Sequence, residues 1–231
     1  MEKIRQFLGF SQQVTTHKEK FVSFLGGVLS IYSVFLVTNL YLGIEDAVYI
    51  IPSMGASAVL LFAAPNVPFS QPWNVLSGHL ISAVIGVACY QFIPDIHIAA
   101  AASVGLAIWA QYYARCIHPP GGATAIAAVI GSSQIHDLGY MYVITPVLVN
   151  TLVMLAVAMI VNGLVSWRYY PASLAPKNSS PKENEYYSPI HHEDFVFALS
   201  QIDSMVDISE DDLLKIYSLA TQHSNRAKTS K

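Results

Sequence analysis

Long uncharged stretches separated by short polar breaks form most of the chain between Phe21 and Trp167. Each stretch has close to the roughly 20 residues that an α-helix needs to cross the hydrocarbon core of a bilayer. They are residues 21–44, 47–65, 73–94, 96–114, 116–135 and 138–167. Two contain residues that disfavour a helix interior, namely Pro52 and the run Pro119-Pro120-Gly121-Gly122. The pattern therefore predicts an all-α polytopic membrane helical bundle with two discontinuous half-helix segments.

The placement of charge also favours a membrane protein. Charged residues make up 12% of the chain, about half of the fraction in an average soluble domain. Those between Phe21 and Tyr170 are Glu45, Asp46, Asp95, Arg115, Asp137 and Arg168. The basic residues form no stripe, which argues against nucleic acid as a partner. We find no catalytic constellation, metal-ligand spacing or phosphate-binding loop, so the sequence predicts no enzyme, no metal and no cofactor.

The composition changes at both ends of the apolar region. Residues 1–20 are polar and mixed in charge, and we expect them to be a cytoplasmic N-terminal segment. Residues 21–170 form the predicted transmembrane domain. Residues 171–189 are rich in Pro, Ser, Asn and Lys, which is typical of a linker. In residues 190–231, two short segments carry apolar residues at helical spacing, which predicts a short soluble C-terminal helical hairpin.

The two interrupted stretches share a sequence motif. Residues 52–58 and residues 119–125 both fit Pro-x-x-Gly-Ala-(Ser/Thr)-Ala. Each motif follows one long apolar stretch and precedes another, which predicts an internal repeat of about residues 21–94 and 96–168. Each repeat would contain a long helix, a discontinuous segment and a second long helix.

Two membrane topologies are compatible with this repeat. If the interrupted segments dip into the bilayer and return, the domain has four crossings and parallel halves. If they cross, it has six crossings and inverted halves. Cytoplasmic loops carry an excess of Lys and Arg. Six crossings place Arg115 and Arg168 on the same side as the basic N-terminal segment, so we favour six crossings with both termini in the cytoplasm.

The interrupted segments have the lengths of half-helices with extended lead-ins. A half-helix of about ten residues rises roughly 15 Å, which is half of the hydrocarbon core. In inverted halves, both half-helix N-termini would meet near the midplane, where their free N–H groups and partial positive charge would bind an anion. The predicted substrate-binding residues are Ser53, Gly55, Ala56, Ser57, His118, Gly121, Gly122, Ala123 and Thr124.

Two further polar residues are part of the hypothesis of an anion site. Arg115 would attract an anion to the cytoplasmic mouth, and the intramembrane His79 is a candidate pathway residue. The alternative is that the small residues of both motifs are helix-packing surfaces, and that His79 is a neutral hydrogen-bond partner of a neighbouring helix.

Residues 116–125, which contain His118-Pro119-Pro120, resemble the signature of the HPP family of integral membrane proteins. Residues 52–58 are similar to the first conserved block of that family. The resemblance covers about residues 21–167. It implies a membrane domain that is usually described with four helices, fewer than the six crossings that the charges favour. Relatives in plant plastids and cyanobacteria are associated with nitrite transport, which implies a small monovalent anion as the substrate.

We therefore expect a multi-pass protein of the cell (inner) membrane that acts as a transporter or channel for a small monovalent anion such as nitrite. Its expected partners are the lipid bilayer and that anion, and a homo-oligomer is compatible with the pattern. Two alternatives stay open. One is a channel for a small neutral solute, and the other is a non-transporting membrane scaffold whose C-terminal hairpin recruits a partner.

Overall fold

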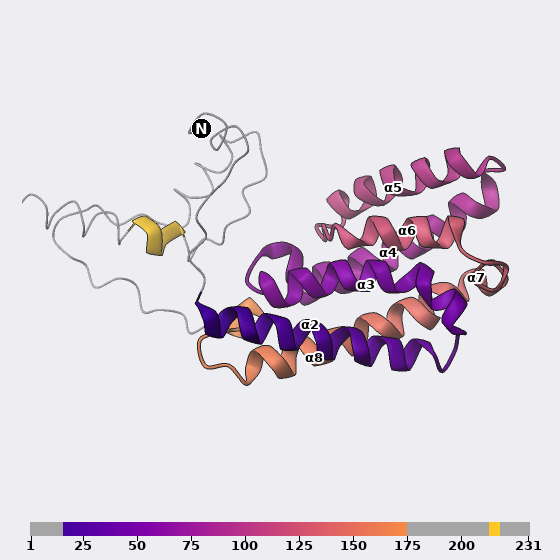
Figure 1. Cartoon of the computed structure of the whole chain (residues 1–231). Coiled ribbons are helices and arrows are strands. Elements are labelled where there is room, and N and C mark those ends of the chain that lie inside the picture. Colours follow the sequence, from indigo (N-terminus) through magenta and orange to yellow (C-terminus); the bar gives the residue numbers. More distant parts are fainter. Residues whose placement is uncertain (1–15, 175–212, 218–231) are drawn as a thin grey trace, which may run out of the picture.

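A bundle of roughly parallel and antiparallel helices forms most of the described part of the chain (Figure 1). The computed structural model describes residues 16–174 and 213–217. The main helices are α2 (His17–Thr38), α3 (Ile44–Ala63), α4 (Pro72–Phe92), α5 (Ile96–Tyr113), α6 (Pro120–Ile130) and α8 (Val149–Gly163). Shorter elements are η1 (Pro68–Ser70), α7 (Ser133–Leu138), the π-helical turn η2 (Val143–Leu148) that runs into α8, and η3 (Ala172–Leu174).

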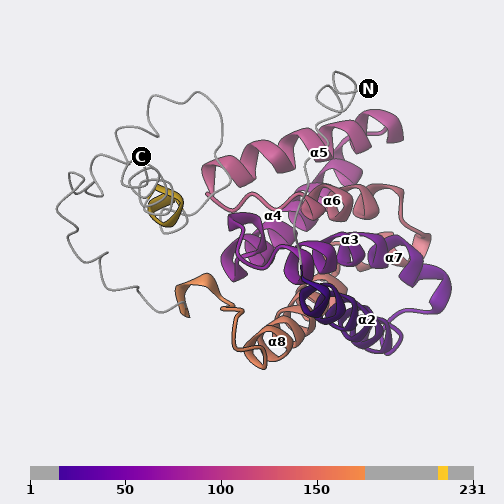
Figure 2. The ribbon, with the colours of Figure 1, turned by 60° about the vertical axis from the view of Figure 1, so that its left-hand side comes forward.

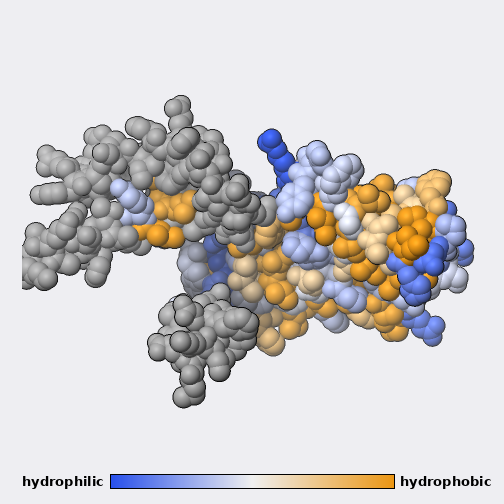
Figure 3. Space-filling view, turned by 90° about the horizontal axis from the view of Figure 1, so that it is seen from above, coloured by the Kyte–Doolittle hydropathy of each residue, from blue (hydrophilic) through white to orange (hydrophobic). Residues whose placement is uncertain are grey.

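Four helical segments of the described residues are long and apolar enough to cross a membrane. They are α2, α3, α4 and the segment Val143–Gly163, which η2 and α8 form with a kink at Thr145, where the backbone is not helical. The remaining two main helices, α5 and α6, lie alongside them in two views (Figures 1 and 2). Large apolar side chains such as Phe24, Val59 and Ile160 are more than half exposed on the outside of the bundle. Apolar residues cover much of the face that Figure 3 shows. The prediction of an all-α polytopic membrane bundle is confirmed.

The first predicted interruption is wrong, because α3 continues through Pro52 without a break. A proline inside a helix costs about 3 kcal/mol or more, but α3 packs against α2, α6 and α8 along its length. Tertiary packing outweighs local propensity in such a position. Ser53 Oγ also donates to Ile50 O at 2.8 Å, and hydroxyl groups of this kind satisfy carbonyls near a proline in membrane helices.

The second predicted interruption is confirmed. Helix α6 has only 11 residues, and the residues before it, 116–118, are not helical. This lead-in lies beside α4, because Asn74 Nδ2 donates to Ile117 O at 2.9 Å. The domain therefore contains one half-helix with an extended lead-in and one full helix at the places where the motif predicts two half-helices.

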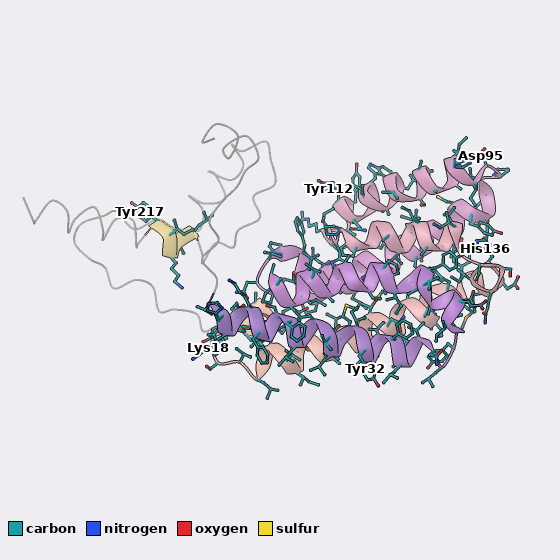
Figure 4. All side chains as sticks on the ribbon, viewed as in Figure 1. Lys18, Tyr32, Asp95, Tyr112, His136 and Tyr217 are labelled. Carbon is teal, nitrogen blue, oxygen red and sulfur yellow. The ribbon has the colours of Figure 1, made fainter. Side chains whose placement is uncertain are left out.

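The two ends of the bundle carry opposite charges. One end holds the start of α2, the η1 region, the lead-in to α6 and the residues after α8, and Tyr170 Oη donates there to Ser70 O at 2.8 Å. At the other end, the ring of His136 stacks on that of Tyr90 with centroids 3.7 Å apart. Figure 4 shows Lys18 and Tyr112 toward the first end, and Asp95 and His136 at the second. The first, which we term the basic end, carries Lys18, Lys20, Arg115 and Arg168 besides Glu19; the second, the acidic end, carries Glu45, Asp46, Asp95 and Asp137.

A buried arginine joins α2 to α8 at the basic end. The Arg168 side chain is 2% exposed and forms an ion pair with Glu19 at 2.6 Å. Its Nη1 donates to Asn162 Oδ1 at 2.8 Å, and its Nη2 donates to Ser23 Oγ at 2.8 Å. Ser23 Oγ in turn donates to Phe62 O at 2.7 Å, so the network also holds the end of α3.

The helix neighbours follow the same order in the two halves of the domain. Helix α3 packs against α2, and α6 packs against α5. Helix α2 contacts α8, and α5 contacts α4, while α3 and α6 contact each other between the halves. The corresponding helices run in opposite directions in Figure 1. Residues 175–189 of the predicted linker, most of the C-terminal hairpin and residues 1–15 of the N-terminal segment lie outside the described residues. Residues 171–174, which include η3, and a helical turn at 213–217 are described.

Candidate functional site

Four of the predicted site residues come together between α3, α4 and α6. Ser57 Oγ lies 2.8 Å from His79 Nε2 and 2.8 Å from His118 Nε2. His79 Nδ1 lies 2.7 Å from Thr124 Oγ1. Ser57, His79 and His118 are fully buried, and Thr124 is 1% exposed. We term these four side chains the histidine cluster. The structure thus brings Ser57, His118 and Thr124, which the sequence suggested as substrate contacts, next to His79, which it suggested as a pathway residue.

When both histidines are neutral, the donor and the acceptor of each hydrogen bond in the cluster can be assigned in one way. His118 Nδ1 lies 2.8 Å from Phe69 O, and because a carbonyl only accepts, the proton is on Nδ1. His118 Nε2 then accepts, so Ser57 donates to it. Ser57 Oγ accepts from His79 Nε2–H, and His79 Nδ1 accepts from the Thr124 hydroxyl. The tautomers are assigned from this network, which leaves every nitrogen and hydroxyl of the cluster paired.

Gln111 of α5 holds His118 in place. Its Oε1 accepts from His118 N at 2.8 Å, and its Nε2 donates to Ser82 Oγ at 2.9 Å. The backbone N–H of Cys116 also donates to Gln111 O at 3.0 Å. Non-helical backbone is tolerated at membrane depth when protein groups satisfy it. Gln111, together with Asn74, therefore makes the unwound lead-in to α6 possible.

Glycines let α4 and α6 approach closely around the cluster. A Cβ on Gly78 would lie 2.5 Å from His118 Cβ, and a Cβ on Gly86 would lie 2.5 Å from Ala125 O. A Cβ on Gly121 would meet Gln111 Nε2 and Ser82 Oγ at 2.7 Å each. Small residues at such contacts are the usual device for packing membrane helices. The packing alternative is thus correct for Gly121, although the same packing positions the histidine cluster.

The predicted pair of converging, open helix N-termini is absent from the described residues. Helix α3 begins at Ile44, near the acidic end and far along the helix from Ser57. At the start of α6, the N–H of Gly121 donates to His118 O at 2.9 Å and that of Gly122 donates to Pro119 O at 3.1 Å. Both amides are therefore used within the turn itself. Side chains, rather than free amides, form the polar site.

The other predicted site residues lie outside the cluster. Ser53 is buried and offers its carbonyl to Ser57 Oγ at 3.1 Å, but its own hydroxyl bonds to Ile50 O. Gly55 lines an apolar groove of about 400 Å³ between α2 and α3, which also borders Gly27 and Phe62. The rest are Ala56, which is exposed, Gly122 and Ala123, which are half-buried on α6, and Arg115, which is exposed at the basic end with φ of 51°.

Four contributors to the site were missed at the sequence level. Gln111 and Ser82 are polar residues inside apolar stretches, and polar groups at membrane depth are a usable signal. Tyr142 Oη donates to Thr124 O at 3.1 Å, which continues the polar chain toward the acidic end. The fourth is the carbonyl of Phe69, which only the folding of η1 brings to His118. Across residues 16–174 and 213–217, no group of three or more His, Cys, Asp or Glu side chains is arranged to hold a metal ion.

Known proteins with similar sequences are transmembrane proteins. The model of the family described as HPP, transmembrane region, matches residues 12–171. A transmembrane protein of Dictyostelium discoideum is 39% identical over 131 residues, which cover 55% of this chain and 42% of the relative. A second one is 38% identical over 126 residues, which cover 53% of this chain and 44% of the relative. The matched part thus spans less than half of either relative. No solved structure matches the chain.

Proposed function

Since the chain belongs to the HPP family of transmembrane proteins, we propose that it is a transporter or channel for a small monovalent anion such as nitrite. The solute passes between α3, α4 and α6 at the histidine cluster. In this proposal, the hydrogen bond between Ser57 and His118 is the contact that closes the path. Opening requires the Ser57 hydroxyl to turn from His118 to the solute.

The observation that carries this proposal is a chain of buried polar side chains inside a membrane bundle. His79 lies seven residues after the start of α4, about 10 Å along the helix axis. Polar and ionisable groups at such depth are costly and mark solute or proton pathways. A purely structural role would need far fewer of them, because the glycines already pack α4 against α6.

The chemistry of the cluster favours an anion over a cation. Among the described residues, no Asp or Glu side chain hydrogen-bonds to any cluster member, whereas hydroxyl and imidazole N–H donors are present. Helix α6 begins beside His118, so the partial positive charge of its N-terminus adds to the local potential. The exposed Arg115 at the basic end attracts anions toward the entrance.

The arrangement of the halves supports an inverted repeat with six crossings. Ser57 and Thr124 occupy the same position in the two motifs, and they bond to the two ring nitrogens of one histidine, His79. Helix α5 has 18 residues, about 27 Å of helix, close to the core thickness. Six crossings gather the basic residues at one end, and this basic end is then cytoplasmic by the positive-inside rule.

Flux into liposomes tests the proposal. Proteoliposomes with the purified full chain should take up nitrite faster than empty liposomes. Ser57→Ala should lower the initial rate by about fivefold, because it removes the donor that meets the solute and one such bond is worth about 1 kcal/mol. Ser30→Ala is the matched control, since Ser30 is also a fully buried helical serine but its hydroxyl has no partner among the described residues. Nitrite uptake by proteoliposomes that equals uptake by empty liposomes would refute the proposed anion transport.

A channel for a small neutral solute is the second candidate. The specific observation in its favour is that all hydrogen bonds of the cluster can be assigned to uncharged groups. The two candidates differ in the solute that crosses. Uptake of an uncharged probe such as urea that exceeds nitrite uptake and ignores the potential would favour the neutral-solute channel.

A further inference from the structure

Ser57 has two acceptors within reach of its single hydroxyl hydrogen. His118 Nε2 lies at 2.8 Å, and the carbonyl of Ser53, one turn earlier in α3, lies at 3.1 Å. In the neutral cluster, the hydrogen must point to His118 Nε2, because that nitrogen carries no proton. The carbonyl of Ser53 is then a spare acceptor directly beside the cluster.

This spare acceptor lets the cluster take up a proton without moving a heavy atom. If His118 gains a proton on Nε2, the new N–H donates to Ser57 Oγ across the same 2.8 Å contact. The Ser57 hydroxyl then rotates and donates to Ser53 O. His79 Nε2–H still donates to Ser57 Oγ, and His118 Nδ1–H still donates to Phe69 O. Every polar hydrogen keeps an acceptor in both states.

We propose that His118, Ser57 and Ser53 O form a binding site for one proton, and that this proton is coupled to the movement of the anion. This inference rests on the proposed transport function. The proton comes from water at the basic end, where Pro119 next to His118 is exposed. No covalent bond other than the transferred N–H is made, and no oxidant or reductant is needed.

The coupling between the proton and the anion follows from their opposite charges. An imidazolium without a counter-charge is unfavourable at membrane depth, and so is an anion among neutral groups. Together they form a neutral pair, so the proton and the anion bind more favourably in each other's presence. The result is symport of one proton with one monovalent anion, which carries no net charge across the bilayer.

The described charged side chains do not contact the cluster, so the bound proton supplies the positive charge that the anion meets. Glu45 and Asp46 lie in the first turn of α3, at the opposite end from Ser57, and Arg115 is exposed. No described charged side chain hydrogen-bonds to the cluster. The other titratable side chains on the packed elements are Cys89 and Tyr90 on α4, Cys116 in the lead-in, Tyr142 before η2, Tyr112 and Tyr113 at the end of α5, His97 at its start, and Tyr49 on α3.

Proteoliposomes loaded with a pH-sensitive dye test the coupling. With nitrite outside and the membrane potential clamped, wild-type protein should acidify the lumen in proportion to nitrite uptake, above the background of empty liposomes. An inward pH gradient should speed uptake, and a change of membrane potential should not. Nitrite uptake without acidification would overturn the proton site and leave the transporter intact. No uptake above empty liposomes would overturn the transport function itself.

A variant pair ties the coupling to His118. His118→Gln keeps one donor and one acceptor but cannot be protonated, so lumen acidification should be lost even where nitrite still enters. His97→Gln is the control, because His97 is exposed at the start of α5, and its acidification should equal that of wild type. Acidification by His118→Gln at the wild-type ratio to nitrite would overturn the proposal.

A measurement on the unaltered protein avoids any dependence on folding of a variant. Nitrogen NMR of histidine-labelled protein in lipid distinguishes the tautomers. At high pH, His118 should carry its proton on Nδ1 and His79 on Nε2. As the pH is lowered, His118 should become protonated on both nitrogens while the protein stays folded. The opposite tautomer of His118, or a His118 that stays neutral until the protein unfolds, would overturn the proton site.

Discussion

Adjacent glycines of the half-helix motif should respond in opposite ways to the same substitution. An alanine Cβ at Gly121 would lie 2.7 Å from Gln111 Nε2, 2.7 Å from Ser82 Oγ and 2.9 Å from Gly78 O. The last contact is with the backbone of α4, which has no rotamer by which to move away. A Cβ at Gly122 meets only Val104 Cγ1 at 3.7 Å, an ordinary van der Waals contact.

The magnitude follows from these contacts. Overpacking a tight interface costs about 1–3 kcal/mol, which changes the ratio of folded to unfolded protein by about 5- to 150-fold. Both substitutions also gain up to about 1 kcal/mol of helix propensity. We therefore expect Gly121→Ala to lower the free energy of unfolding by up to about 2 kcal/mol, the overpacking cost less the propensity gain. Gly122→Ala should leave it unchanged or raise it by less than about 1 kcal/mol.

The assay is unfolding of the purified protein in mixed micelles with increasing denaturing detergent, followed by helical circular dichroism. Wild type and the two variants are compared in the same lipid and detergent, so the only difference is the position of one methyl group. Equal destabilisation by both variants, or a larger loss for Gly122→Ala, would refute the close packing of Gly121 against α4 and α5.

Two further predictions concern the ends of the bundle. Arg168→Ala should lower the free energy of unfolding by about 3 kcal/mol, because it leaves Glu19, Asn162 and Ser23 without their buried partner. Lys20→Ala is the control, because Lys20 is exposed. Equal midpoints of detergent unfolding for the two variants would contradict the network around Arg168. At the acidic end, hydrogen bonds from the backbone N–H of Ile98 and of His97 lower the pKa of Asp95 below its ordinary value of 3.8. Since the folded pKa is the lower one, the stabilisation is complete above this value and is lost as the pH falls through the folded pKa. Asp95→Asn should flatten the dependence of the melting temperature on pH in this acid range. An unchanged slope would contradict the role of Asp95 as the N-terminal cap of α5.

The sequence predicted the parts of the site that depend on local chemistry. Histidine in an apolar stretch is rare enough to be a signal, and it identified His79. The matched motifs identified Ser57 and Thr124, and the run Pro119-Pro120-Gly121 predicted the break before α6, since consecutive proline and glycine residues remove hydrogen bonds and favour non-helical backbone. The same reasoning failed at Pro52, where packing of α3 against three helices outweighs the local cost.

Hydropathy and motif spacing by themselves determined that this chain is a bundle of membrane-length helices with a polar interior, and they predicted two half-helices, of which the structure has the one at α6. Only the tertiary structure decided what that polar interior is. The contacts Ser57–His79, Ser57–His118 and His118–Phe69 O join residues 22, 61 and 49 positions apart. The direction of a hydrogen-bond chain depends on which acceptor ends it, and here that acceptor is the carbonyl of Phe69. A backbone carbonyl is present at every residue, so its role is set by its position in the fold and leaves no trace in the sequence.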